Sequence, residues 1–202
     1  MILLIILVTA LISYLSFNNP ALFEKLVFSP YRIFHKKEYI RWISHGFIHA
    51  DYMHLIVNML TLYFFSSALE QISIIIAGDF WFLYFILFYL LSIVMSSLYS
   101  YFKNKDNYRY SAVGASGATS AMIFSYILFA PTSKIYLYFA IGIPAWLFGV
   151  LYLVYEYYMG KRQQDNIGHD AHFFGALFGV VFTIISYPDV IYHLMNELGI
   201  AF

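Results

Sequence analysis

The sequence predicts an all-α, polytopic membrane protein that folds as a bundle of six transmembrane helices. Its 202 residues are 62% hydrophobic and only 11% charged, which is too apolar for a water-soluble domain of this size. Apolar runs that approach the length needed to cross roughly 30 Å of hydrocarbon recur along the whole chain. No polar stretch between them is long enough for a separate domain, so we expect residues 1–202 to form a single membrane domain.

Charged residues, glycines and prolines divide this apolar sequence into the expected spans. The first, near residues 1–17, lacks the basic start and small-residue cleavage site of a signal peptide, so we expect a retained helix. The other five are expected near residues 52–70, 80–102, 116–130, 134–157 and 169–187. The connection between the first two spans is much longer than the median loop of about 4 to 6 residues, which predicts a structured, partly embedded loop.

The charge and cysteine content narrows the possible partners. Eleven basic residues balance eleven acidic ones, so nothing in the charge predicts a nucleic-acid partner. The sequence has no cysteine, which removes disulfides, thiolate metal sites and a cysteine nucleophile. The aromatic content of 22% is typical of side chains that face lipid or the membrane interface. The expected surroundings are the lipid bilayer and other membrane proteins.

The fourth expected span is too short to cross the membrane. It runs for 15 residues, from Ser116 to the residue before Pro131, or roughly 22 Å at about 1.5 Å per residue. One end must therefore lie below the membrane surface, where backbone is tolerated only if it is buried in protein or lines a wet cavity. The small residues Gly114, Ala115, Ser116 and Gly117 form its start. The pattern predicts a serine at a recessed helix start in a water-filled cavity.

Two other spans carry polar side chains that are costly inside a membrane. In the second span, His54 and Asn58 are four residues apart and share one helix face. In the sixth span, His172, Gly175 and Gly179 have the spacing i, i+3 and i+7, which places the histidine on a face made smooth by glycine. We expect this face to press closely on the start of the fourth span.

These residues supply the groups that acyl transfer requires. Ser116 is the candidate nucleophile, and His172 is the candidate base that takes its proton. The pair His54 and Asn58, with the backbone N–H of Ser116, can donate hydrogen bonds to an oxyanion. We expect no acidic residue inside a span to orient His172, so the sequence predicts a Ser-His dyad and not a triad.

Three motifs in the same order resemble those of the rhomboid family. Residues 45–58 (HGFIHADYMHLIVN) are similar to its second-span signature, residues 114–117 (GASG) to Gly-x-Ser-Gly, and residues 171–175 (AHFFG) to Ala-His-x-x-Gly. The resemblance implies a six-helix bundle that cleaves transmembrane segments of proteins, or their juxtamembrane ends, without a metal or other cofactor.

The resemblance also implies a role for each matching residue. Ser116 and His172 correspond to the dyad, and His54 and Asn58 correspond to the oxyanion site. His49 would lie near the active-site water or support the site, and His45 would help to hold the first loop. The matching glycines, expected to be structural, are Gly114, Gly117, Gly175 and Gly179.

This sequence departs from the family pattern in two places. Some members have Trp-Arg in the first loop where this chain has Arg41 followed by Trp42, which puts the bracing role of Arg41 in question. Bacterial relatives can carry a tyrosine one turn after the nucleophile, where this chain has Ser120. We expect the packing beneath His172 to come from elsewhere.

Two other functions can be derived from the same polar residues. A metal-dependent membrane hydrolase is one, because the histidines include i, i+3 and i, i+4 pairs that could hold zinc: His45, His49, His54, His169 and His172. A transporter or proton relay is the other, since intramembrane His and Asn also line such pathways. We expect no metal, a structural or solvated role for His45 and His169, and a helix-capping role for Asp170.

Membrane orientation is predicted differently by charge and by family. Loops one, three and five hold ten of the eleven basic residues: Lys25, Arg32, Lys36, Lys37, Arg41, Lys103, Lys105, Arg109, Lys161 and Arg162. The positive-inside rule would make that side cytoplasmic. The resemblance implies instead a multi-pass protein of the bacterial inner membrane whose active site opens on that side, away from the cytoplasm. We follow the resemblance, and expect the fifth span, with Gly142 and Pro144 as weak points, to gate the site.

Overall fold

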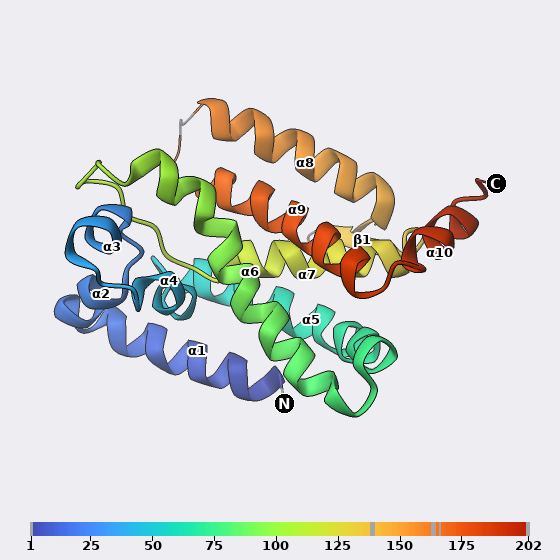
Figure 1. The fold of residues 1–202 in the computed structure, drawn as a ribbon, viewed down its shortest axis with the longest axis horizontal. Coiled ribbons are helices and arrows are strands. Elements are labelled where there is room, and N and C mark those ends of the chain that lie inside the picture. Colours follow the sequence, from blue (N-terminus) through green and yellow to red (C-terminus); the bar gives the residue numbers. More distant parts are fainter. Residues whose placement is uncertain (1, 138–139, 163–164, 166, 201–202) are drawn as a thin grey trace.

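The computed structural model describes residues 2–137, 140–162, 165 and 167–200, and helices dominate this part of the chain (Figure 1). The α-helices are α1 (Ile2–Phe17), α2 (Pro20–Leu26), α3 (Pro30–Lys36), α4 (Arg41–Ser44), α5 (Tyr52–Ala77), α6 (Trp81–Asn104), α7 (Ser116–Phe129), α8 (Ala145–Arg162), α9 (His169–Ser186) and α10 (Val190–Glu197). Two short 3₁₀ helices, η1 (His45–Phe47) and η2 (Gly78–Phe80), and two strands, β1 (Lys134–Leu137) and β2 (Ile141–Pro144), complete these elements. The prediction of an all-α fold is confirmed, with one small hairpin added.

The helix lengths agree with a membrane bundle. Within the described residues, two helical stretches are long and apolar enough to cross a bilayer, Ser67–Asn104 and His169–Ser186. Three shorter apolar helices accompany them, namely Ile2–Phe17, Tyr52–Phe65 and Ser116–Phe129. Six complete spans stay a prediction.

The expected fifth span, residues 134–157, is wrong in its first half. Strands β1 and β2 form an antiparallel hairpin there, and helix α8 begins only at Ala145. Residues 138–139 of the expected span lie outside the described residues. Pro144 explains the boundary, because proline disfavours helical backbone at the residue before it. Gly142 and Pro144 lie in β2, so they are not weak points inside a helix.

Helix α7 lies inside the bundle and packs against α5, α6, α8 and α9. In Figure 1, α8 and α1 lie at opposite edges of the molecule, with α9 and α7 between them. The helix begins at Ser116, as expected, and its 14 residues span only about 21 Å. Most of its side chains are buried, so the nucleophile candidate is carried by a helix that is fixed by its neighbours.

Glycines let α7 and α9 meet backbone to backbone. A Cβ atom built on Gly175 would overlap the carbonyl oxygen of Gly117, and one built on Gly179 would overlap the carbonyl oxygen of Ala121. Both obstacles are backbone atoms, which cannot move aside as a flexible side chain can. The predicted close contact between the fourth and sixth spans is therefore present, and it needs glycine at both positions of α9.

The first loop is structured, and Arg41 holds it together. Its guanidinium is almost fully buried and donates hydrogen bonds to the carbonyl oxygens of Glu24 (2.8 Å) and Val27 (2.7 Å) and to Oε2 of Glu38 (2.6 Å). Burial opposes the charge on Glu38, but Arg41 and Arg32 outweigh it and hold the pKa of Glu38 below its usual value. The order Arg41-Trp42 thus still provides a bracing arginine.

His45 joins this loop to helix α6. Its Nδ1–H donates to the carbonyl oxygen of Arg41 (2.8 Å), so its Nε2 accepts from the hydroxyl of Ser97 (3.0 Å). Burial lowers the pKa of His45 to about 4, although the Arg41 carbonyl acts in the opposite direction. The ring is therefore neutral near pH 7, and its position is the one expected of a residue that holds the loop.

The α7–α9 contact predicts that Gly179→Ala destabilises the bundle. Alanine improves helix propensity by about 1 kcal/mol over glycine. Overpacking costs roughly 1 to 3 kcal/mol, and the new Cβ atom would overlap backbone atoms, which cannot move aside. We expect a lower melting temperature in detergent. The matched control is Gly168→Ala, whose new Cβ meets only the Cβ of Ala171, at 3.8 Å. Equal melting temperatures for Gly179→Ala and wild type would contradict the close contact.

Candidate active site

Ser116 is the first residue of helix α7 and is half-buried. The residue before it, Ala115, makes no side-chain cap, so the N–H groups of the first turn have no side-chain acceptor from that position. These groups and the helix dipole give the surroundings of Ser116 a positive character. The serine hydroxyl is thus placed where a developing negative charge is favoured.

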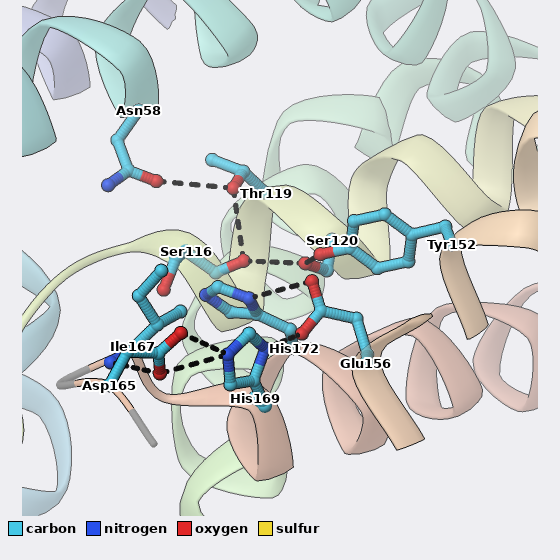
Figure 2. Close-up of polar contacts among 10 residues, drawn as sticks. All are labelled: Asn58, Ser116, Thr119, Ser120, Tyr152, Glu156, Asp165, Ile167, His169 and His172. Carbon is cyan, nitrogen blue, oxygen red and sulfur yellow. Dashed lines mark hydrogen bonds and ion pairs between the residues drawn. The ribbon is translucent and has the colours of Figure 1, made fainter. Parts of the chain in front are cut away.

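His172 lies in the first turn of α9, directly beside this point. The carbonyl oxygen of Ala171 would be 3.3 Å from a Cβ atom built on Gly117, so the chain neighbours of Ser116 and His172 are in contact. Figure 2 shows the hydroxyl of Ser116 and the carboxylate of Glu156 on opposite sides of the His172 ring. The structure brings the two predicted dyad residues together where α7 and α9 begin.

The expectation that no carboxylate meets His172 is wrong. Oε1 of Glu156, on α8, lies 3.2 Å from Nδ1 of His172, and the carboxylate is buried, with 4% of the residue exposed. The sequence held a signal for it, because Glu156 is an ionisable residue in an apolar helix, and such residues are functional candidates by default. Glu156 lies one residue before the end of the expected span, but α8 continues to Arg162, and the side chain is buried.

The same carboxylate also binds His169. Oε2 of Glu156 is 2.6 Å from Nδ1 of His169, and the Nε2 atom of that ring lies 3.1 Å from Oδ1 of Asp165. A ring with a carboxylate at each nitrogen must donate at both, which is the hydrogen-bond pattern of imidazolium. His169 is buried, so of the two roles expected for it, structural or solvated, the structure favours the structural one.

The two oxyanion candidates approach the start of α7 from α5. Asp51 caps α5 by accepting a hydrogen bond from the backbone N–H of His54 (2.8 Å). The ring of His54 lies so close to Gly114 that a Cβ atom there would be 2.6 Å from Nε2. Gly114 also has a φ of 113°, a backbone conformation that favours glycine. The amide of Asn58 faces α7, where its Oδ1 accepts from the hydroxyl of Thr119 (3.3 Å).

His49 is fully buried and fixes the residue before the nucleophile candidate. Its Nε2 accepts a hydrogen bond from the backbone N–H of Ala115 (3.4 Å), and its Nδ1 lies 2.9 Å from Oγ of Ser13. The Ser13 hydroxyl donates to the carbonyl oxygen of Phe47 (3.0 Å), so the His49 ring donates to Ser13. This chain of bonds ties the start of α7 to α1, which fits the supporting role among those expected of His49.

A tyrosine from α8 contacts Ser120, the residue one turn after the nucleophile candidate. The hydroxyl of Tyr152 lies 2.6 Å from Oγ of Ser120. Since the Ser120 hydroxyl donates to the carbonyl oxygen of Ser116 (2.8 Å), Tyr152 is the donor to Ser120. Helix α8 therefore supports both sides of the site, through Tyr152 to α7 and through Glu156 to α9.

The five histidines of the zinc hypothesis are not gathered into one site. Among the described residues, the ligand atoms close enough to hold a metal ion belong to Glu156, His169 and His172, within 4.8 Å of one another. Two ligands of a tetrahedral zinc, each about 2.0 Å from the metal, lie about 3.3 Å apart. The 2.6 Å between Glu156 and His169 is shorter than that and is typical of a charge-assisted hydrogen bond.

The comparison with protein families agrees with this geometry. The family model described as a Rhomboid domain matches residues 36–189, which include every residue of the site except Ser13. The chain belongs to the rhomboid family. At the level of the family, rhomboid proteins are membrane-integral and are intramembrane serine proteases, although some members are inactive.

One curated relative is "RHOMBOID-like protein 12, mitochondrial" from Arabidopsis thaliana. It is 29% identical to this rhomboid chain over 145 residues, which are 66% of this chain and 42% of the relative. The chain thus spans less than half of the relative's length. The similarity supports the family, and the activity of this chain is taken up as a proposal.

The hydrogen-bond chain through His49 predicts that Ser13→Ala weakens the site from a distance. The substitution leaves the buried Nδ1–H of His49 without its acceptor, which costs roughly 1 to 3 kcal/mol. We expect a lower melting temperature in detergent. The matched control is Ser92→Ala, since Ser92 is equally buried but donates within its own helix, to the carbonyl oxygen of Phe88. Equal melting temperatures for Ser13→Ala and Ser92→Ala would show that the hydrogen bonds through His49 do not stabilise the site in this way.

Proposed function

We propose that this rhomboid chain is an active intramembrane serine endopeptidase, which hydrolyses peptide bonds in or next to transmembrane segments of other membrane proteins. The observation that carries the proposal is the meeting of Ser116 and His172 at the starts of α7 and α9, across a contact that only glycine permits. Inactive relatives usually lack the serine or the histidine of the dyad, and both are present here.

The proposed reaction follows the general logic of serine hydrolases. Oγ of Ser116 attacks the carbonyl carbon of the scissile bond while Nε2 of His172 takes the hydroxyl proton. The imidazolium then gives this proton to the leaving amine, and an ester of Ser116 remains. A water molecule, deprotonated by the same histidine, hydrolyses the ester and restores the serine.

The oxyanion of the tetrahedral intermediate would form next to the first turn of α7. The backbone N–H of Ser116 lies there, and the side chains of His54 and Asn58 approach from α5. Donors fixed before the reaction stabilise developing charge without reorganisation, and removing one such donor costs about 10² to 10³ in rate in other enzymes. Oδ1 of Asn58 accepts a hydrogen bond from Thr119, and its Nδ2 donates one N–H to the carbonyl oxygen of His54 (3.0 Å). The second N–H of Nδ2 and the ring of His54 would be the side-chain donors to the oxyanion.

The proposed setting is a multi-pass protein whose site opens on the side of loops one, three and five. In a bacterial inner membrane this would be the extracytoplasmic side. The plant relative is named as mitochondrial, which does not favour a bacterial membrane over another one. The chemistry of the site is the same in either setting.

A metal-dependent hydrolase is the second candidate, because Glu156, His169 and His172 form a cluster with ligand-type atoms. The 2.6 Å between Glu156 and His169 favours a hydrogen bond over coordination by a shared metal. The cluster also uses His172, so the two mechanisms differ most clearly at Ser116, which the metal mechanism does not need.

The proposal predicts that Ser116→Ala and His172→Ala each abolish cleavage of a test substrate with one transmembrane segment, measured in detergent micelles. The nucleophile is absent in the first variant and the base in the second, so rates should fall by at least about 10³-fold. The matched control is Ser111→Ala, which replaces an exposed serine in the preceding loop. Cleavage that survives Ser116→Ala but disappears with a chelator would favour the metal mechanism and overturn this one.

A further inference from the structure

We infer that Glu156 is a positioning residue for His172, so that the site works as a Ser-His-Glu arrangement in which the carboxylate comes from α8. This inference rests on the proposed serine protease function. It concerns the buried cluster of Glu156, His169 and His172, in which only His172 takes part in the proposed chemistry.

The two oxygens of the carboxylate are divided between the two rings. Oε1 lies 3.2 Å from Nδ1 of His172, and Oε2 lies 2.6 Å from Nδ1 of His169. The side chain of Glu156 is 5% exposed and that of His169 is 3% exposed, so both groups are removed from solvent. A carboxylate this deeply buried must be paired or it would be too costly to ionise.

His169 provides that pairing. It donates to Glu156 at one nitrogen and to Asp165 at the other, which requires the charged, doubly protonated ring. Asp165 has a side chain that is 32% exposed, so it balances the cation from the solvent side. The cluster can therefore keep Glu156 negative while it faces His172.

A negative Glu156 fixes the protonation of His172. Ionised carboxylates only accept hydrogen bonds, so Nδ1 of His172 must carry the proton, and the lone pair of the neutral ring is then on Nε2. In Figure 2 the Ser116 hydroxyl lies on the side of the ring away from Glu156, where Nε2 can take its proton. The same carboxylate would stabilise the imidazolium that forms during attack.

The competing explanation is that Glu156 only fastens α8 to α9. In that case its loss would affect stability and folding, and it would not act through His172. The chain offers a matched control in Asp170, which is one residue from His169 in the same helix turn. The Asp170 carboxylate binds Nζ of Lys103 on α6 (2.8 Å) and has no contact to His172 among those of the described residues.

The test compares Glu156→Gln with Asp170→Asn in cleavage assays on protein that elutes as a folded species in detergent. We expect Glu156→Gln to lower kcat by roughly 10² to 10⁴, as seen when such a carboxylate is made neutral, with little change in KM. The kcat of Asp170→Asn should stay within about threefold of the wild-type value. If Glu156→Gln is recovered misfolded, Glu156→Asp replaces it, and its carboxylate is one methylene too short to reach both rings.

A second measurement separates positioning from structure. The rate of Ser116 labelling by a fluorophosphonate is compared for Glu156→Gln in the wild-type and His172→Ala backgrounds. If Glu156 acts through His172, Glu156→Gln should not lower the labelling rate any further in the His172→Ala background. Equal losses in both backgrounds, or a kcat within threefold of wild type, would overturn the inference. Cleavage by Ser116→Ala would instead overturn the proposed function itself.

Discussion

The backbone contact between α7 and α9 is the constraint on which the rest of the site depends. Gly175 and Gly179 bring α9 so close to α7 that a single added Cβ atom at either position would overlap a carbonyl oxygen. Ser116 and His172 are the residues at the open end of this contact, so their separation follows from the packing of the two backbones. A nucleophile and a base on stiff helices keep their geometry better than the same residues on loops.

Hydrogen bonds from three other elements hold this contact in place. His49 connects the start of α7 to α1, Asn58 reaches α7 from α5 through Thr119, and Tyr152 reaches it from α8 through Ser120. Polar side chains inside a membrane protein have few alternative partners, so bonds of this kind specify a position as well as stabilise it. The nucleophile candidate is therefore fixed through the residues before and after it, which leaves its own hydroxyl available.

Much of this arrangement could be predicted from the sequence. The start of α7 at Ser116 follows from the small residues there. The glycine face of α9 and the shared helix face of His54 and Asn58 follow from spacing. The hairpin before α8 was missed because apolar residues in short strands and in helices look alike by hydropathy. The contact of Glu156 with His172 was missed because no spacing rule relates residues on different helices, and only the packing of α8 against α9 brings them together.

In the proposed mechanism, Ser116 is a nucleophile activated by His172. A direct test is to treat the folded protein with a fluorophosphonate and to locate the adduct by mass spectrometry of its peptides. We expect one adduct, on Oγ of Ser116, which forms far more slowly in the His172→Ala protein. An adduct on another residue, or labelling of Ser116 that is equally fast without His172, would contradict the mechanism.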